Sequence, residues 1–256
     1  MNTIFSVFHK DFYTPKNKLI KPIGVGKNVC AGVPGAVRDN TGENISLLNP
    51  HYCELTAMFW IWKNFKQGDQ DIVGLVHYRR YFYNHSWLFS KVARLLRKFK
   101  LGSYNEYFIS SEKEVIEILK SKKIIVPKIE LCTLGHEPLS IKEEYQTSHI
   151  ATDWPLIKEA ISENCPEYLN IFDDFGNGKY LFNCNMFITT RKEFDKYCSW
   201  LYPLLQKFYS RTEISTDPYQ ARAVGFIAER LLNVYVLRNF AKDEVAYLEK
   251  SFIDWE

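Results

Sequence analysis

The sequence predicts an α/β fold in a single domain, because segments typical of strands alternate with segments typical of helices along all 256 residues. Short apolar runs at Ile4–Phe8 and Ile72–Val76 have the length and bounds of buried strands. Helix starts are also marked, since Ser111 and Glu114 form a capping box and Pro155 stands in the first turn of another helix. No repeat or linker divides the chain, so we expect one central, mostly parallel sheet flanked by helices.

Local sequence patterns predict each of the remaining elements. A helix over 50–64 follows from apolar residues that recur nearly all round its surface, which also predicts burial on several sides. Residues 14–48 carry Gly, Pro and Asn without periodicity and are expected to be mostly loop. Thr190 and Glu193 form a second capping box, which opens a helix to about residue 209. The other expected elements are a helix over 111–120, a strand over 124–126, a helix over 153–164, a strand region over 181–189 and a helix over 225–239.

Composition excludes several classes of protein. A chain that is 46% hydrophobic and 25% charged is typical of a globular protein, and a net charge of +3 is too small to indicate nucleic-acid binding. The six cysteines are scattered without a Cys-x-x-Cys pair, which argues against zinc and against a disulfide framework. The N-terminus lacks the pattern of a signal peptide, and no apolar run approaches 18 residues. We therefore expect a protein of a reducing cytoplasm that binds no nucleic acid.

The strand expected at Ile72–Val76 runs directly into His77, Tyr78, Arg79 and Arg80. Ligands of open α/β sheets bind beyond the carboxyl ends of the strands, and two arginines at such a place are costly unless an anion meets them. Arginine also suits phosphate, because its planar fork donates two parallel hydrogen bonds. The pattern therefore indicates a site for an anion such as a diphosphate. The alternative is a pair of arginines that bind the protein's own carboxylates.

Residues 87–100 predict a helix of a different kind. Five apolar side chains share one face, and five basic side chains cover the rest with no acid among them. The apolar residues are Leu88, Val92, Leu95, Leu96 and Phe99, and the basic residues are Lys91, Arg94, Arg97, Lys98 and Lys100. Such a helix either makes peripheral contact with an anionic membrane surface or packs on the core with a solvated basic face.

A resemblance to a known family rests on five segments, Pro22–Val25, Asp39–Ser46, Asn49–Asn64, Asn183–Ile188 and Gly225–Tyr235, and covers nearly the whole chain. The resemblance is to one family of bacterial glycosyltransferases, which is encoded in capsule and O-antigen loci and was long catalogued only as a domain of unknown function. It implies a single GT-A-like (Rossmann-like) nucleotide-sugar transferase domain over residues 1–256. Residues 1–130 would lie mainly on the nucleotide-sugar side, and residues 131–256 mainly on the acceptor and catalytic-base side.

The resemblance also implies an activity. Family members with assigned activity include galactofuranosyltransferases that use UDP-galactofuranose with inversion. We therefore expect an inverting hexosyl transfer, with galactofuranose as the first candidate, from a UDP-sugar to a lipid-linked saccharide in capsule or O-antigen biosynthesis. UDP-galactopyranose or another UDP-hexose is the alternative donor. The enzyme would work in the bacterial cytoplasm, as a peripheral protein on the inner face of the cytoplasmic membrane.

In GT-A transferases the strand that corresponds to Ile72–Val76 precedes a metal-binding Asp-x-Asp. Here His77, Tyr78 and Arg79 stand in that place, and the Asp-Gln-Asp at 69–71 lies before the strand instead. We therefore expect no protein metal site and no required cofactor, with the arginines offsetting the charge of the diphosphate. The alternative is a bound Mn²⁺ or Mg²⁺.

On this template the donor would be bound by the ends of the early strands, by the loop over 39–46, by Glu54 and by the cationic residues after the strand. The donor-binding candidates are Phe8, His9, Asp39, Asn40, Asn44, Ser46, Glu54, His77, Tyr78, Arg79 and Arg80. Turn formation alone also favours the polar residues of the loop. Pairing with one of the arginines is the alternative role of Glu54, since a carboxylate on an apolar helix needs a partner.

An inverting transfer needs a carboxylate that takes the proton of the acceptor hydroxyl. Glu229 is the first candidate for this base, with a salt bridge to Arg222 or Arg230 as its alternative role. Asp153 is the second candidate, with helix capping as its alternative. The acceptor-binding candidates are His149, Trp154, Asn183 and Asn185. Asparagine is disfavoured in strands, so a bulge or bend is the alternative reason for the two asparagines.

Two other classes of protein remain to be weighed. A non-catalytic nucleotide-sugar or glycan-binding module would share the arginines and the aromatic residues but would not need Glu229. A phosphotransferase is disfavoured, because the chain has no Gly-x-x-x-x-Gly-Lys-Ser/Thr loop.

Overall fold

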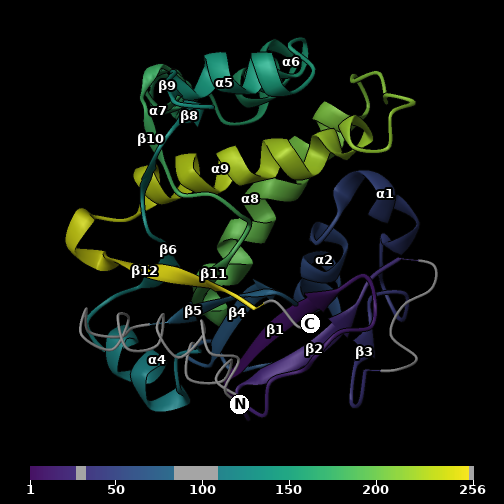
Figure 1. Cartoon of the computed structure of the whole chain (residues 1–256), viewed down its shortest axis with the longest axis vertical. Coiled ribbons are helices and arrows are strands. Elements are labelled where there is room, and N and C mark those ends of the chain that lie inside the picture. Colours follow the sequence, from purple (N-terminus) through teal and green to yellow (C-terminus); the bar gives the residue numbers. More distant parts are fainter. Residues whose placement is uncertain (27–32, 84–108, 254–256) are drawn as a thin grey trace.

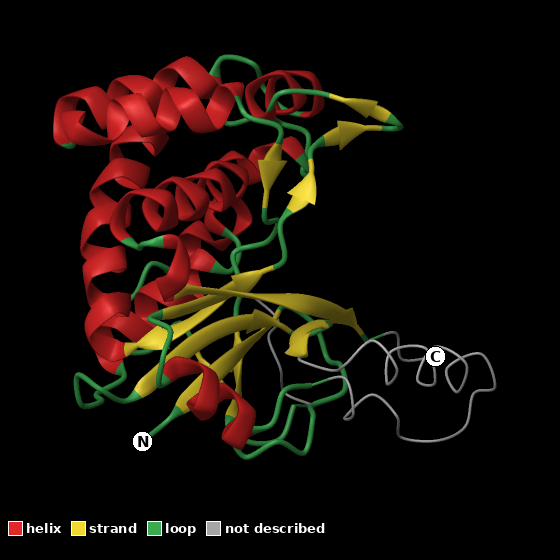
Figure 2. Cartoon of the chain, turned by 90° about the vertical axis from the view of Figure 1, so that its left-hand side faces the viewer, coloured by secondary structure: helices red, strands yellow, loops and turns green. Residues whose placement is uncertain are grey.

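The computed structural model describes residues 1–26, 33–83 and 109–253. The described residues form one eight-stranded sheet, and helices lie on both of its faces (Figure 1 and Figure 2). Its strands are β1 (Thr3–Phe8), β2 (Ile20–Gly24), β3 (Val37–Arg38), β4 (Ile72–His77), β5 (Arg80–Tyr83), β6 (Ile124–Pro127), β11 (Phe187–Thr190) and β12 (Val245–Phe252). Two short ribbons pair β7 (Glu130–Leu131) with β10 (Tyr180–Leu181) and β8 (Thr133–Leu134) with β9 (Glu137–Pro138).

The sheet is mixed, so the expectation of a mostly parallel sheet is wrong for the described residues. Parallel pairs join β1 to β2, β1 to β4, β2 to β3 and β6 to β12. Antiparallel pairs join β4 to β5, β5 to β12, β4 to β11 and β6 to β11. The reason is that β5 turns straight back from β4, while β11 enters against β4 and β6. These pairings close a cycle of five strands beside the parallel β4-β1-β2-β3 portion.

The helices are α1 (Asn49–Tyr52), α2 (Leu55–Asn64), α4 (Glu112–Leu119), α5 (Ile141–Ser148), α6 (Asp153–Asn164), α7 (Leu169–Asn177), α8 (Arg191–Tyr209) and α9 (Ala223–Asn239). The expected helices at 111–120, 153–164, 190–209 and 225–239 are confirmed within two residues, and the Ser111 capping box is complete. Thr190 accepts from the Glu193 N–H at 3.5 Å, but the Glu193 carboxylate pairs with Lys196. Only half of the second capping box is therefore formed.

The segment expected to be mostly loop contains two strands, β2 and β3. Ile4, Phe5, Ser6, Val7 and Phe8 pair in register with Ile20 to Gly24, so parallel pairing with β1 stabilises a strand that its own Gly and Pro content disfavours. The strands β5 and β12 and the helices α5 and α7 were also not expected from the sequence.

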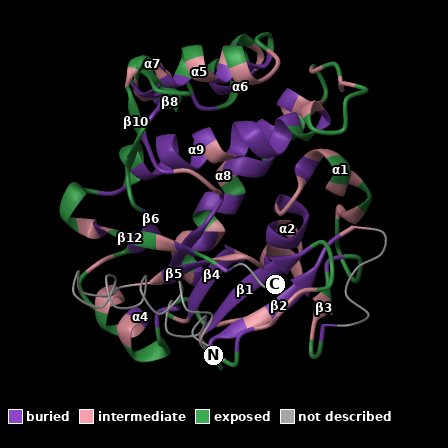
Figure 3. Cartoon of the chain, viewed as in Figure 1, coloured by how far each residue is buried: buried purple, intermediate pink, exposed green. Residues whose placement is uncertain are grey.

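Two apolar clusters lie on the two faces of the sheet. Phe5 and Leu75 belong to the cluster under α2, α8 and α9, whereas Ile4 and Val76 belong to the cluster that includes Val115 of α4. This separation follows from the alternation of side chains along a strand. The central strands and nearly the whole of α9 are buried (Figure 3).

The helix expected over 50–64 is broken at Cys53, between α1 and α2. The φ angle of Cys53 is 51°, in the left-handed region that non-glycine residues rarely adopt. Gly225 of α9 lies against this break, since a Cβ at that position would be 3.2 Å from the Cys53 sulfur. The small residue lets α9 approach the break closely, and this brings the start of α9 to the side chain that follows, Glu54.

A buried arginine joins α8 to the end of α2. The Arg191 guanidinium donates to the carbonyl oxygens of Ile61 at 3.2 Å, Trp62 at 2.7 Å and Phe65 at 2.5 Å, and it pairs with Asp195. The Trp62 and Phe65 carbonyls lie at the end of α2, where helix carbonyls have no partner within the helix, whereas the Ile61 carbonyl also accepts from the Phe65 N–H at 3.2 Å.

We expect Arg191→Met to lower the free energy of unfolding by about 3 kcal/mol, because it leaves the Trp62 and Phe65 carbonyl groups without a donor. Urea unfolding monitored by circular dichroism measures the loss. Lys192→Met is the matched control, since the neighbouring lysine side chain is exposed. Equal stability of the two variants would contradict the role given to Arg191.

Candidate functional site

A cavity of about 870 Å³ opens at the carboxyl ends of the parallel strands β1 and β4. Its walls come from these strand ends, the β4–β5 turn, the α1–α2 break, the end of α5, the segment before β11 and the first turns of α9. Ligands of α/β proteins bind at this edge, and the volume is in the range of small-molecule sites.

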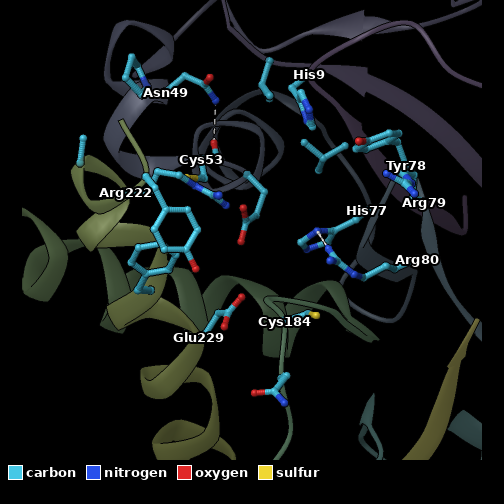
Figure 4. A pocket seen from close by; sticks show the side chains of 18 of the residues that line it. His9, Asn49, Cys53, His77, Tyr78, Arg79, Arg80, Cys184, Arg222 and Glu229 are labelled. Carbon is cyan, nitrogen blue, oxygen red and sulfur yellow. Dashed lines mark hydrogen bonds between the residues drawn. The ribbon is translucent and has the colours of Figure 1, made fainter. Parts of the chain in front are cut away.

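The cavity brings together many of the residues singled out in the sequence. Predicted residues that line it are His9, Glu54, His77, Tyr78, Arg79, Arg80, His149, Asn183 and Glu229. Lining residues that the sequence did not assign to a site are Asn49, Cys53, Glu144, Cys184, Tyr219, Arg222, Phe226 and Arg230. Figure 4 shows Glu229 on one side of the cavity, facing His77, Arg80 and Arg222.

The β4–β5 turn forms a cationic wall. The Arg80 guanidinium lies 3.4 Å from His77 Nδ1 and 5.1 Å from the centre of the Phe252 ring, while Arg79 lies 4.8 Å from the same ring. Among the described residues, no carboxylate is within ion-pairing distance of Arg80, so the alternative of a structural salt bridge does not apply to it there. Arg80 is thus available to an anion in the cavity.

His77 contributes no positive charge to this wall near neutral pH. Burial lowers the pKa of its imidazole to about 4, and the positive charge of Arg80 adds to the effect. The neutral ring is therefore available as a hydrogen-bonding group, and the arginines supply the charge.

Arg222 adds a third guanidinium from the far wall. Its Nε donates to the Cys53 sulfur at 3.2 Å, and it has no carboxylate partner among the described residues. It ends a short 3-10 helix, Gln220–Arg222, just before α9. No local pattern distinguishes it, since a lone arginine before a helix is common; only the packing of α9 against α1 places it here.

Glu229 is a half-buried carboxylate on α9, with 26% of its side chain exposed. Burial raises its pKa, nearby Glu54 raises it further, and Arg230 lowers it. The salt bridge to Arg230, given above as the alternative role of Glu229, is present at 3.3 Å, but Arg230 binds Glu144 more closely, at 2.9 Å. Glu229 is therefore the weaker partner of that arginine, and its raised pKa suits a general base.

Glu54 presents a second carboxylate to the cavity. Its Oε1 accepts a hydrogen bond from Asn185 Nδ2 at 2.7 Å, and burial raises its pKa. Pairing with Arg79 or Arg80 is not found among the described residues. The same Asn185 amide donates to Gly225 O at 3.3 Å. Asn185 thus holds Glu54 against the start of α9 from behind and does not itself line the cavity, so it is not placed to bind an acceptor directly.

The two asparagines lie in a bend between β10 and β11, as the alternative interpretation had it. Cys184 between them has a φ of 77°, and the strand expected over 181–189 is interrupted there. Asn183 lines the cavity and donates to Glu130 Oε2 at 3.0 Å.

Asp153 does not line the cavity. It is fully buried, with its oxygens bound by the Tyr145 hydroxyl at 3.0 Å and the Thr212 hydroxyl at 2.8 Å. The residue is also not the N-cap of α6, which is Thr152. Its neighbour Trp154 is buried against Phe172. Both residues join α6 to its surroundings, and a role in proton transfer or acceptor binding does not fit this placement.

Several expected donor contacts also lie outside the lining of the cavity. Phe8 is fully buried and Asp39 nearly so, and burial raises the pKa of Asp39. Asn40 and Asn44 are exposed, and Asn44 Oδ1 accepts from the Ser46 hydroxyl at 2.9 Å. The loop over 39–46 is therefore held by its own turn bonds, which agrees with the alternative interpretation, and also by hydrogen bonds from Trp60 and Asn64 of α2.

The Asp-Gln-Asp sequence lies at the end of β4 opposite the cavity. The Asp71 carboxylate binds the N-terminal amine of Met1 and accepts from the Gly68 N–H at 3.0 Å. Across the described ranges, no three His, Cys, Asp or Glu side chains gather as metal ligands would.

The segment over 87–100 lies outside the described residues. Among the helices that are described, none has the length and hydropathy needed to cross a membrane.

Comparisons with known proteins show which family the chain belongs to. None of the curated proteins matches the chain. Among solved structures, the apo structure of WbbM, a bifunctional glycosyltransferase, matches with a TM-score of 0.79 and 26% sequence identity. The match covers 99% of this chain but 45% of the WbbM chain, so this chain spans less than half the length of that protein. A family model, described as a domain of unknown function (DUF4422), matches residues 3–240. The chain therefore belongs to the DUF4422 family.

Proposed function

We propose that the protein is a glycosyltransferase that uses a nucleoside-diphosphate sugar. The observation that carries the proposal is the cavity at the ends of β1 and β4, which is lined by Arg79, Arg80, Arg222 and Glu229, with Arg80 and Arg222 facing the Glu229 carboxylate. The likeness to WbbM over 99% of the chain supports the same class of reaction. The mixed sheet with a parallel β4-β1-β2-β3 portion is compatible with a GT-A-like fold.

The three arginines would neutralise the donor diphosphate. Their guanidinium groups come from two opposite walls, so a diphosphate between them receives charge-assisted hydrogen bonds from both sides. Negative charge grows on the leaving diphosphate as the sugar departs, and fixed cations in a partly enclosed site stabilise it. Neutral His77 would donate a hydrogen bond to the same oxygens.

Glu229 would act as the base. The acceptor hydroxyl oxygen attacks the anomeric carbon, the bond from that carbon to the diphosphate oxygen breaks, and the diphosphate keeps the electron pair. The hydroxyl proton passes to Glu229. A single displacement of this kind inverts the anomeric configuration. The finer proposal is a hexosyl transfer, with UDP-galactofuranose as first donor candidate, to a lipid-linked saccharide of capsule or O-antigen biosynthesis.

A donor screen by mass spectrometry tests the function. Wild-type protein and Glu229→Gln are incubated with a panel of UDP-hexoses, including both ring forms of galactose, and octyl glycosides as acceptors. We expect a product with the mass of one added hexose from the wild type and little from the variant. UDP binding without turnover on any donor would instead support a non-catalytic nucleotide-sugar or glycan-binding module.

Activity should persist after exhaustive treatment with EDTA. The reason is that His77, Tyr78 and Arg79 occupy the place of the usual metal-binding carboxylates, with the arginines offsetting the charge. The measurement is the initial rate in EDTA, compared with the rate in excess Mn²⁺ or Mg²⁺. Loss of activity in EDTA with recovery on adding Mn²⁺ would show that a divalent metal is required.

The segment over 87–100 should bind the protein to anionic membranes, because its five basic side chains can each contribute about 1 kcal/mol near an anionic leaflet at low salt. Liposome co-sedimentation should show less pelleting when Lys91, Arg94, Arg97 and Lys98 are changed to Gln, and the binding should weaken with salt. The control changes four exposed lysines elsewhere to Gln, namely Lys113, Lys120, Lys192 and Lys196. Equal pelleting of the two variants would remove the special role of this segment.

A further inference from the structure

We propose that Tyr219, Phe226 and His149 form an aromatic surface on which a sugar ring of the acceptor stacks. The inference rests on the proposed function and deepens it, because it assigns the acceptor a place on a wall of the cavity different from the cationic turn. All three residues line the cavity, and they come from the loop before α9, from α9 itself and from the end of α5.

The three rings form one cluster, in which the Tyr219 and Phe226 rings are 5.1 Å apart with an angle of 45° between their planes. The His149 and Phe226 rings are 4.0 Å apart with an angle of 23° between their planes, and the His149 and Tyr219 rings are 6.1 Å apart at 25°. Phe226 is 8% exposed, whereas Tyr219 is 54% exposed. The inner rings thus support an outer ring that has a large solvent-accessible surface beside the cavity. Aromatic surfaces of this kind bind apolar ring faces at little conformational cost.

The aromatic surface is held in place before any ligand arrives. The backbone N–H groups of Tyr219 and Gln220 donate to Asp217 Oδ1 at 3.0 and 2.8 Å, and the Gln220 side chain donates to Ser148 O at 3.1 Å. Arg222 lies 5.7 Å from the centre of the Tyr219 ring and 5.3 Å from that of Phe226. The loop before α9 is thereby tied to α5, and a guanidinium stabilises the rings from a neighbouring position.

On the side of the aromatic surface that faces Glu144 and Glu229, away from Arg222, the charge favours a neutral, hydroxyl-rich ligand over a phosphate. Arg230 is already paired with Glu144 and Glu229, so its charge is compensated. The carboxylate oxygens of these two residues can accept hydrogen bonds from sugar hydroxyls but repel an anion. The diphosphate is better placed between the β4–β5 turn and Arg222, and a nucleotide there would extend toward His9 and Val25 at the ends of β1 and β2.

The helical register also brings the aromatic surface next to the proposed base. Phe226 and Glu229 are three residues apart on α9, and side chains at that spacing are neighbours on one helix face. A sugar that rests on the aromatic surface would therefore present its hydroxyl groups toward Glu229.

The test measures saccharide binding directly, without turnover. Octyl glycosides of common hexoses are titrated by saturation-transfer NMR in the presence of UDP against wild type, Tyr219→Ala, Tyr219→Phe and Tyr180→Ala. Tyr180 is a matched control, since it is 67% exposed on β10 and does not line the cavity. We expect Tyr219→Ala to weaken binding of at least one glycoside roughly 3- to 10-fold, while Tyr219→Phe and Tyr180→Ala bind as wild type does. The affinity for UDP should be the same in all four proteins.

Three results would overturn the inference. They are the absence of glycoside binding to wild type, equal binding by wild type and Tyr219→Ala, and a loss of UDP affinity in Tyr219→Ala, which would mean that the nucleobase stacks there. Failure of the proposed function looks different. In that case wild type binds a glycoside through Tyr219 but transfers no sugar from any donor.

Discussion

Glu229→Gln should reduce the rate of sugar transfer by roughly 10²- to 10⁴-fold while leaving UDP affinity unchanged. This is the usual size of a general-base contribution, and glutamine keeps the shape of the side chain but cannot take a proton. The expectation depends on the place of Glu229, on the cavity wall that faces His77 and the arginines. The measurement pairs steady-state kcat/KM with a calorimetric titration of UDP.

The pH dependence should identify the same group. Burial raises the pKa of Glu229, so the carboxylate is protonated up to a higher pH than an ordinary glutamate. A base works only when deprotonated, so kcat/KM should fall as the pH drops through this raised pKa. The residual activity of Glu229→Gln should lack that acidic limb. The profile is measured between about pH 4 and pH 9, with stability checked at each pH.

Two other carboxylates serve as comparisons. Glu54→Gln keeps an oxygen that can accept from Asn185, so it should retain most of the activity. Asp153→Asn should lower stability, because the Tyr145 and Thr212 hydroxyls both donate to Asp153, but it should keep the acidic limb of the rate profile. The assignment of the base to Glu229 is wrong if Glu54→Gln abolishes sugar transfer while Glu229→Gln retains it.

Arg80→Ala should weaken UDP binding by roughly 10- to 150-fold with little change in melting temperature. A charge-assisted hydrogen bond to phosphate contributes about 1.5–3 kcal/mol, which corresponds to that range. Folding should depend less on this side chain, because no carboxylate pairs with Arg80 among the described residues. Arg79→Ala should likewise affect UDP binding or turnover more than folding. Calorimetric titration with UDP and thermal unfolding measure the two effects.

The control for this prediction is Arg238→Ala. Arg238 is an exposed arginine in the last turn of α9 and does not line the cavity. Its substitution by alanine removes the same charge as Arg80→Ala does. An Arg80→Ala protein with normal UDP affinity and a collapsed melting temperature would assign the arginine to the structure of the β4–β5 turn instead.

Local patterns were sufficient for several elements that carry their own signals, although the capping box of α5, formed by Ser140 and Glu143, was missed. The apolar runs of β1 and β4 are buried on both faces of a sheet, so they stand out without reference to any partner. The helix α4 has a complete capping box, and α9 has apolar residues on nearly every side. By contrast β3 has two residues, and β2 contains both Gly and Pro, so their extended form depends on pairing with β1 or with each other.

Some residues of the candidate site were likewise predictable from local patterns, and others were not. The run from His77 to Arg80 was recognisable because it is contiguous and follows a buried strand, and Glu229 because it stands on an apolar helix. Whether a polar residue faces the cavity was decided only by the tertiary structure. Asp153 precedes Trp-Pro and was predicted as a site residue, yet the hydroxyl groups of Tyr145 and Thr212 bind its carboxylate.

The sequence by itself determined where the strands β1 and β4 and the main helices lie, and that a cationic run follows β4. The tertiary structure decided which side chains meet. Asn185 holds Glu54 from 131 positions away, and Arg222 meets Cys53 across 169 positions. Periodicity and capping act within a few residues, whereas these contacts join segments far apart in the chain. The contact of Arg222 also depends on the break at Cys53 and on the small Gly225, which let α9 approach α1 closely.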